Sequence, residues 1–183
     1  ADGANSTVRR LTGQSDCFDS AFAIEAQVPC SSACDSDAMK FDFGVVPRGY
    51  GWVFPKGDHL NVGLYTYDAR FKLFPPQLKS YIKQILGTDD AQELVGHSIG
   101  LGAGKYDHRG RRLFLVGDAG GFCDPMLGEG IYYAIRSGQM AAAAITDDVR
   151  GGGSAEVGFR ERSEYLRSDL RTAHYLAVRF YRD

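Results

Sequence analysis

The sequence contains no run close to the roughly 18 to 20 uninterrupted apolar residues that a transmembrane helix needs. Its first ten residues, ADGANSTVRR, lack the apolar region of a signal peptide. It also lacks an excess of one charge, since 21 Lys and Arg face 23 Asp and Glu, for a net charge of -2. Nucleic acids require a concentrated basic face. We therefore expect no nucleic-acid partner, and a cytoplasmic protein with at most peripheral membrane contact through its Arg-rich last helix.

Cysteine is scarce, with four residues in the chain. Because 44% of the 183 residues are hydrophobic, the chain can bury a core without a disulfide scaffold, and free thiols are expected. Cys30 and Cys34 lie in a Pro/Ser/Asp-rich loop without a second Cys or His pair at zinc spacing, so we predict no metal site. Cys17 and Cys123 are isolated. The histidines are expected to be structural or surface residues: His59, His97, His108 and His174.

Strand patterns dominate the first part of the chain. Apolar residues tend to alternate from Phe18 to Val28, which is typical of a half-buried strand. Further strands are expected over residues 40–46, 51–55 and 60–67. The turn signals Pro47-Arg48-Gly49 and Lys56-Gly57-Asp58 separate them and predict an antiparallel meander. A helix over residues 78–86, closed by Gly87, is expected to cover the sheet.

The alternation gives this sheet two different faces. Tyr50, Trp52 and Phe54 share one side of their strand. The next strand carries leucine and valine on one side and, on the other, Asn61, Gly63, Tyr65 and Tyr67. Aromatic side chains align in this way both over a ligand and in a plain core, so the pattern alone leaves both interpretations open.

The second half of the chain has an α/β pattern. The apolar run 113–116 predicts a strand buried on both faces, as in a parallel sheet. The long helix after it is expected to pack through a stripe of small and branched residues: Ile131, Ala134, Ile135, Gly138, Ala142 and Ile145. A glycine run at 151–153 breaks the chain. The last helix, from about Ala155 to Tyr181, is expected to bury Leu166, Leu170, Ala173, Ala177 and Phe180.

The turn between the expected strand and the long helix has features of a nucleotide site. The strand places Asp118 at its carboxyl end, where a carboxylate can accept hydrogen bonds from a ribose. Pro125 stiffens the turn, and the N–H groups at the helix start favour negative charge on a flavin. Glu129 is expected to be an acid at the helix start, and Cys123 a small packing residue. Gly117-Asp118 alone also fits an ordinary strand-to-helix turn.

The chain resembles a known family through four stretches of sequence. ADGANSTVRR and GDAGGFCDPMLGEG look like the DG and GD segments of flavoproteins built like aromatic hydroxylases, and the helix after residue 6 supports the first assignment. GYGWVFPKGDHLNVGLY resembles the Y-x-W-x-F-P signature of geranylgeranyl reductases, and GEGIYYAIRSG is close to that family's flavin helix.

The resemblance implies an architecture that combines α+β and α/β parts, with FAD as the cofactor. No side chain is assigned a catalytic role. A partial FAD-binding lobe is expected from residues 1–14 and 110–150, an antiparallel-sheet substrate lobe from 15–109, and a C-terminal helical segment from 151–183. The expected cofactor residues are Asp2, Gly3, Arg9, Gly117, Asp118, Pro125, Gly128, Glu129, Gly130 and Ile131. The expected substrate-pocket residues are Tyr50, Trp52, Phe54, Pro55, Gly63 and Tyr65.

Two departures from the family pattern affect what the resemblance implies. Tyr65 stands where the pattern has a second glycine after the signature, which narrows the expected pocket. No G-x-G-x-x-G segment for the adenosine diphosphate half is present. The expected activity is reduction of isoprenoid double bonds, with NAD(P)H or a ferredoxin-like protein as electron donor. A flavin monooxygenase or halogenase and a non-catalytic binding fragment remain as alternatives.

Overall fold

The computed structural model describes residues 2–13, 19–30, 38–68, 70–102 and 112–182. The chain forms two compact units: unit 1 consists of Ala1–Ser20 and Ile99–Phe180, and unit 2 of Ala21–Ser98 and Tyr181–Asp183. Cys17, Cys34 and His108, for which no functional role was expected, lie outside the described residues.

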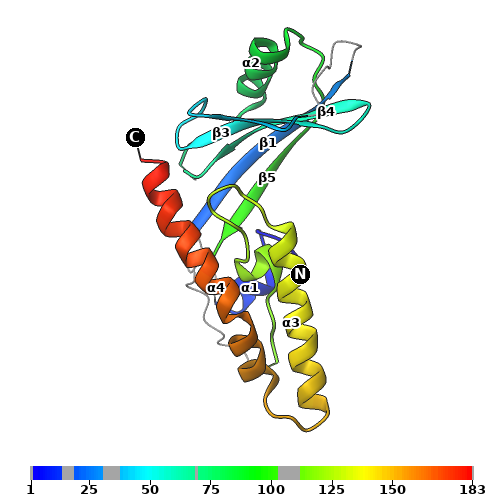
Figure 1. The fold of residues 1–183 in the computed structure, drawn as a ribbon, viewed down its shortest axis with the longest axis vertical. Coiled ribbons are helices and arrows are strands. Elements are labelled where there is room, and N and C mark those ends of the chain that lie inside the picture. The colour runs from blue at the N-terminus through cyan, green and yellow to red at the C-terminus, as the bar shows by residue number, and fades with distance from the viewer. Residues whose placement is uncertain (1, 14–18, 31–37, 69, 103–111, 183) are drawn as a thin grey trace. The chain divides into compact units, whose positions relative to one another are not determined.

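Unit 2 is built on a five-stranded sheet with the order β2-β3-β4-β1-β5 (Figure 1). The strands are β1 (Asp19–Pro29), β2 (Lys40–Phe43), β3 (Gly49–Pro55), β4 (His59–Thr66) and β5 (Gln92–Leu101). The antiparallel pairing of β2 with β3 and of β3 with β4 confirms the predicted meander. β2 is shorter than expected, because Gly44 adopts a φ of 83° and turns the chain directly after Phe43.

The edge strand β5 was not predicted. Its sequence, QELVGHSIGL, lacks a clear apolar alternation, and most of its residues are exposed. A strand at the edge of a sheet needs few buried side chains, so its backbone pairing leaves little trace in the sequence.

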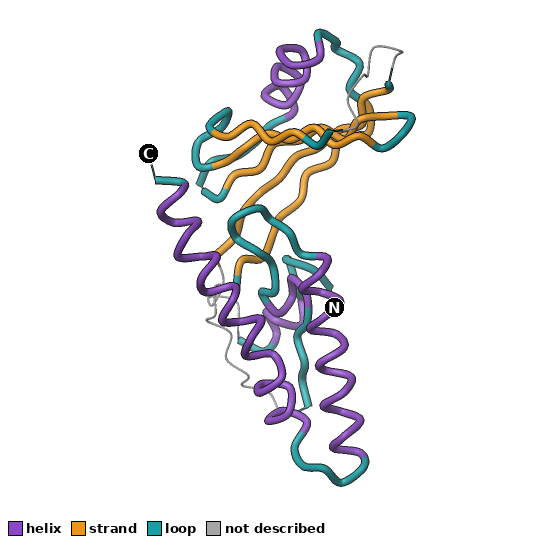
Figure 2. The backbone as a smooth tube through the Cα atoms, viewed as in Figure 1, coloured by secondary structure: helices purple, strands orange, loops and turns teal. Residues whose placement is uncertain are grey.

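Helix α2 (Pro75–Leu86) covers one face of this sheet (Figure 2). Its buried residues Leu78, Tyr81 and Ile82 pack against apolar residues from the strands. The helix begins three residues earlier than predicted, because two prolines occupy its first turn and the Gln77 side chain accepts the Phe74 N–H at 2.7 Å. It ends, as predicted, at Gly87 with a φ of 71°.

The turn after β4 supplies a pH-dependent contribution to stability. Asp68 accepts hydrogen bonds from the Arg70 backbone and side chain at 2.8 to 3.0 Å, and Arg70 lowers the pKa of Asp68 from 3.8 to about 2. Since the folded pKa lies below the unfolded one, the contribution is present above about pH 4 and is lost as the pH falls to about 2. We expect the urea midpoint of unfolding to fall less steeply between about pH 4 and about pH 2 in Asp68→Asn than in the unmodified protein. The same dependence of the midpoint on pH in both proteins would contradict this role of Asp68.

Unit 1 contains two long helices, α3 (Ile131–Val149) and α4 (Ala155–Phe180), together with the short helix α1 (Thr7–Leu11) and the 3-10 turn η2 (Gly117–Gly120). The two long helices lie side by side as an antiparallel pair (Figure 1). The strand predicted over residues 113–116 is wrong. Val116 is extended, with φ -124° and ψ 164°, but the described part of the chain offers this run no pairing strand.

The expected packing stripe of α3 is also wrong. Ile131 is 77% exposed and Ile135 56% exposed. The residues buried between α3 and the rest of unit 1 are instead Ser137, Met140, Ala141 and Ala144. These also follow the i, i+3, i+4, i+7 spacing, so a helix this rich in alanine and isoleucine presents two candidate faces, and the pattern alone does not choose between them.

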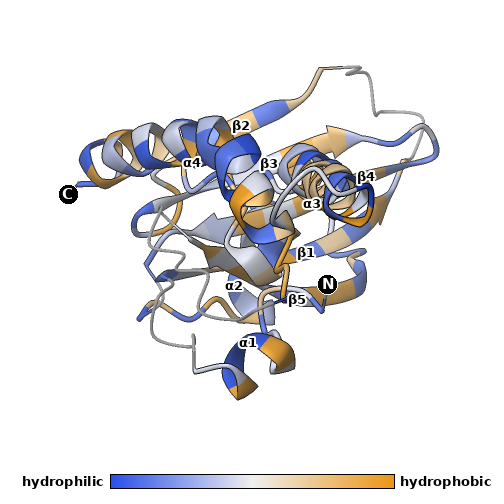
Figure 3. Cartoon of the chain, turned by 90° about the horizontal axis from the view of Figure 1, so that it is seen from below, coloured by the Kyte–Doolittle hydropathy of each residue, from blue (hydrophilic) through white to orange (hydrophobic). Residues whose placement is uncertain are grey.

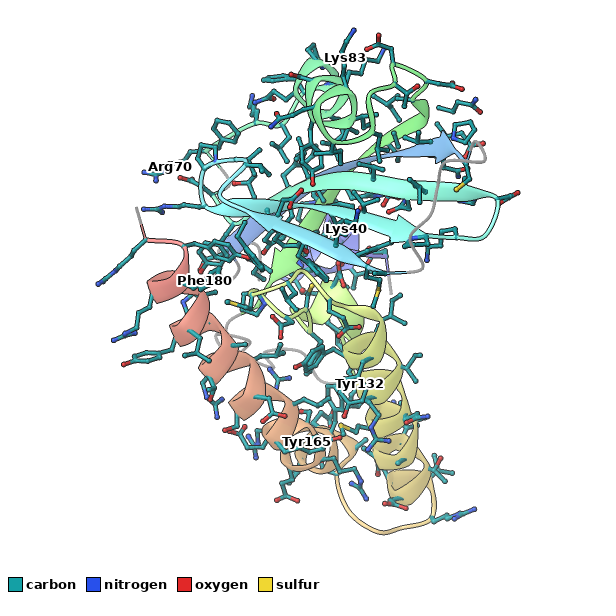
Figure 4. The ribbon with its side chains drawn as sticks, turned by 45° about the horizontal axis from the view of Figure 1, so that its top comes forward. Lys40, Arg70, Lys83, Tyr132, Tyr165 and Phe180 are labelled. Atoms are coloured by element: carbon teal, nitrogen blue, oxygen red, sulfur yellow. The ribbon has the colours of Figure 1, made fainter. Side chains whose placement is uncertain are left out.

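Helix α4 follows the prediction in part, and its banded colouring in Figure 3 shows its mixed polarity. Leu166, Leu170 and Ala177 are buried as expected, whereas Phe180 is 51% exposed. Arg167, next to Leu166, is also buried, and its guanidinium lies 4.7 Å from the centre of the Phe122 ring. On the outer surface, the Tyr165 hydroxyl (labelled in Figure 4) accepts a hydrogen bond from Arg136 of α3 at 3.0 Å. Among the described helices, none is long and apolar enough to cross a membrane.

Candidate functional site

The GD turn, residues 117–121, places a half-buried carboxylate at the start of α3. The backbone closes on itself there, because the N–H groups of Gly121 and Phe122 bind the carbonyls of Asp118 and Gly117. Burial raises the pKa of Asp118, while backbone N–H groups, including that of Gly100, and the charge of Arg9 lower it. Asp118 is thus an acceptor in a partly dehydrated setting, where a hydrogen bond contributes more than in water.

Gly130 gives the Asp118 carboxylate its space. A Cβ at Gly130 would lie 3.0 Å from Asp118 Oδ1, which is tighter than a side chain normally accepts, and 3.5 Å from Cys123 Sγ, which is an ordinary contact. No side chain caps α3 at Gly130. The Glu129 carboxylate accepts the Tyr132 N–H at 2.8 Å, as expected of an acid at a helix start. Residues 128–131, which are half-buried or exposed, thus lie beside the half-buried carboxylate of Asp118.

Two residues that the sequence did not single out organise this loop. Asp124 Oδ1 accepts the N–H groups of Met126 and Leu127 at 2.6 and 3.2 Å. Ser137 Oγ, fully buried on α3, accepts the Gly117 N–H at 3.0 Å and so fixes the GD turn to the helix. An Asp followed by Pro and later Gly is the local signal that could have identified Asp124; the role of Ser137 depends on a contact across 20 residues.

The N-terminal DG segment is joined to the same turn through Arg9. The Asp2 carboxylate accepts the N–H groups of Thr7 and Val8 at 2.8 and 3.2 Å, and Ser6 caps α1 by accepting the Arg9 N–H. The Arg9 side chain, 8% exposed, donates to the carbonyls of Ala4, Asp118 and Ala119. The structure thus unites Arg9 with Asp118 within unit 1.

Cys123 is a poor candidate for redox chemistry. Its thiol lies against the Glu129 carbonyl at 3.3 Å, and burial, followed by the charges of Asp118, Asp124 and Glu129, raises its pKa. A thiol held in its neutral form is a weak nucleophile. Cys123 therefore acts as a small packing residue in the loop.

In unit 2, the face of the sheet opposite the packed residues of α2 carries aromatic rings from β2, β3 and β4. The register pairs Tyr50 with Tyr65 and Trp52 with Gly63, which confirms that these positions share one face. Neighbouring ring centres lie 5.1 to 6.4 Å apart. We call this set the aromatic face: Phe41, Phe43, Tyr50, Trp52, Phe54 and Tyr65. The β2 members, Phe41 and Phe43, were not singled out from the sequence, although their alternation on a strand was a usable signal.

Tyr65 is the residue that departs from the family pattern, and it is 1% exposed. Its ring centre lies 5.1 Å from Tyr50 and 6.4 Å from Tyr181. A glycine at position 65 would leave that volume empty. The side chain therefore fills space within the aromatic face.

Gly63 allows the Trp52 indole to lie against the backbone of β4. A Cβ at Gly63 would lie 2.0 to 2.5 Å from three indole atoms. We expect Gly63→Ala to displace the ring and to reduce the free energy of unfolding by about 1 to 3 kcal/mol, as overpacking does. Gly138→Ala is the control: nothing lies within 4 Å of its Cβ position, and alanine should stabilise α3 by about 0.5 to 1 kcal/mol. Urea unfolding measures both, and equal effects of the two changes would contradict the prediction.

Known proteins share both the sequence and the fold of this chain. The family described as the geranylgeranyl reductase catalytic domain matches residues 19–104. An uncharacterised protein of Methanosarcina barkeri is 36% identical over 186 residues, which cover 99% of this chain and 47% of that protein. The chloroplastic geranylgeranyl diphosphate reductase of Nicotiana tabacum is 33% identical over 93% of this chain and 36% of its own length.

A solved structure gives the same result. The geranylgeranyl bacteriochlorophyll reductase-like protein of Thermoplasma acidophilum has a TM-score of 0.72 and 26% identity, over 89% of this chain and 43% of that chain. The GD turn beside a helix start, together with an aromatic-faced antiparallel sheet, defines a flavoprotein oxidoreductase architecture. Within that class, the chain belongs to the geranylgeranyl reductase family. It spans less than half the length of these relatives.

Proposed function

We propose that the intact protein reduces carbon–carbon double bonds of an isoprenoid chain, with bound reduced FAD supplying the hydride. The observation that carries the proposal is the aromatic face on the sheet that matches the geranylgeranyl reductase catalytic domain. On this face Phe41 and Phe43, 40% and 48% exposed, offer a polyene chain a rigid apolar surface, and the buried ring of Tyr50 packs against both. A relative named geranylgeranyl diphosphate reductase supports the same substrate class.

Within this proposal, unit 1 contributes to FAD binding. The described residues fit this role, because Asp118 is a half-buried acceptor and the lack of a side chain at Gly130 lets its carboxylate lie close to the start of α3. We assign the ribitol or pyrophosphate region to Asp118, the neighbourhood of the pyrophosphate to Asp2, Gly3 and Arg9, and the flavin ring to residues 128–131. Gly117 and Pro125 shape the turn.

Unit 2 contributes the substrate surface in the same proposal. Tyr50, Trp52 and Phe54 would contact the isoprenoid chain, with Pro55 closing β3 and Gly63 keeping Trp52 close to the sheet. NAD(P)H or a ferredoxin-like protein would return the electrons.

The test is an anaerobic assay of the longest native form of the protein. The protein is purified without added flavin, and the absorbance spectrum and mass of the released cofactor are recorded. Chemically reduced holoprotein is then mixed with geranylgeranyl diphosphate, and a mass gain of one H2 per reduced double bond is expected. A product that forms only with oxygen would instead establish a monooxygenase or halogenase. A protein that stays colourless when FAD is added would leave a binding module as the better account.

A further inference from the structure

Trp52 is the one tryptophan of the chain, and a specific set of contacts fixes it in the aromatic face. The register places Trp52 opposite Gly63 of β4, and Gly63 opposite Glu25 of β1, so the three residues form a row across three strands. The indole is 7% exposed and lies against Gly63. Apolar contact with a glycine backbone holds a ring close but does not set its direction, because such contact is non-directional.

Hydrogen bonds supply that direction. Trp52 Nε1 donates to Asn61 Oδ1 at 2.6 Å, and Asn61 Nδ2 donates to Glu25 Oε2 at 3.2 Å. An indole N–H only donates, and an ionised carboxylate only accepts. The Asn61 amide can therefore satisfy both neighbours in one orientation only. Glu25 fixes the amide, and the amide fixes the ring.

The chain of contacts does not transfer protons. Neither an indole N–H nor a carboxamide releases a proton in the pH range of proteins, so Glu25 does not deliver one through Asn61 to the aromatic face. Its other carboxylate oxygen lies 3.6 Å from His97 Nε2 near the surface. The arrangement holds a ring in place instead.

We infer that Asn61 and Glu25 are positioning residues that hold the Trp52 indole in the orientation against which the isoprenoid chain is bound. This inference rests on the proposed function for its substrate and deepens it by naming two residues outside the aromatic signature. Their effect on the substrate passes entirely through Trp52.

The first experiment records the fluorescence emission maximum, acrylamide quenching and near-UV circular dichroism of the full-length protein. The Trp52 signal is defined as the part of each measurement that is lost in the Trp52→Phe variant. Asn61→Leu is expected to raise the quenching constant of Trp52 and to reduce its near-UV signal. In the double variant Asn61→Asp with Glu25→Gln, the new carboxylate at position 61 can accept from both the Trp52 indole and the new amide at position 25. Both hydrogen bonds can therefore form again, and the Trp52 signal should match that of the unmodified protein. Gln92→Leu is the control, because Gln92 is an amide of β5 that binds Asp90 and is not paired with Asn61.

The second experiment measures KM and kcat with geranylgeranyl diphosphate and the FAD-loaded protein. Asn61→Leu should raise KM about 3- to 10-fold, the scale of one lost hydrogen bond, and change kcat less. In the Trp52→Phe background the same change should have almost no effect on KM, because the residue it positions is gone. If Asn61→Leu acted only by destabilising the sheet, its effect on KM would persist in the Trp52→Phe background.

The outcomes separate this inference from the proposed function. An unchanged Trp52 signal in Asn61→Leu, loss of that signal in the double variant, or additive KM effects would each overturn the positioning role. Absence of any geranylgeranyl reduction by the unmodified protein would overturn the proposed function, whereas the Trp52 signals would still decide whether Asn61 and Glu25 hold the ring.

Discussion

Replacing Asp118 by alanine is expected to weaken FAD binding by about 10- to 100-fold, the scale of one hydrogen bond to a charged group. The carboxylate is half-buried in the GD turn, beside the backbone space left by Gly130. Burial removes water that would otherwise compete for the same acceptor, so a ribitol or ribose hydroxyl gains a strong partner. The measurement is a fluorescence titration of FAD into the full-length protein stripped of flavin.

Two further variants test whether the charge of Asp118 matters and whether the effect is specific to this carboxylate. Asp118→Asn keeps the shape and one acceptor oxygen but removes the charge, so its loss of affinity should be smaller, about 2- to 10-fold. Asp147→Asn serves as the control, because Asp147 is a surface carboxylate of the same unit that pairs with Arg162. FAD affinity within about twofold of the unmodified protein in Asp118→Ala would refute the assignment of Asp118 as a cofactor residue.

The sheet of unit 2 could be predicted because its information is local. Alternating side chains identify a strand, and glycine with proline marks the turns, so the meander and the shared face of Tyr50, Trp52 and Phe54 follow from neighbouring residues. The same logic placed α2 and its end at Gly87. The edge strand β5 escaped prediction because its pairing needs no buried side chains.

The remaining features depend on contacts that are distant in the sequence. Residues 113–116 have the composition of a buried strand, but a strand also requires a pairing partner, which lies outside what a local pattern encodes. Helix α3 has two apolar faces, and only its contact with α4 selects the one with Met140 and Ala144. The bonds from Asn61 to Trp52 and Glu25 likewise require the register of three strands.

Arg9 is the strongest such case, and Arg9→Ala is expected to lower the free energy of unfolding by about 2 to 4 kcal/mol. The guanidinium joins segments 109 and 110 residues apart in the sequence by donating to the carbonyls of Asp118 and Ala119, each at 3.3 Å, and also to that of Ala4. Alanine cannot donate to these carbonyls, so partly buried acceptors lose their partner. The loss should appear in urea unfolding of the full-length protein, together with weaker FAD binding.

A neighbouring arginine provides the matched comparison. Arg10 is exposed, and its side chain donates to Thr7 Oγ1 at 3.0 Å within the same short helix, so Arg10→Ala should change stability by less than about 0.5 kcal/mol. Arg9→Lys keeps the charge but loses the planar fork that reaches several carbonyls at once, and its effect should fall between the two. Arg9 bonds across this long sequence separation, whereas the described bond of Arg10 is local. Similar unfolding free energies for Arg9→Ala and Arg10→Ala would therefore show that the DG and GD segments are held together without Arg9.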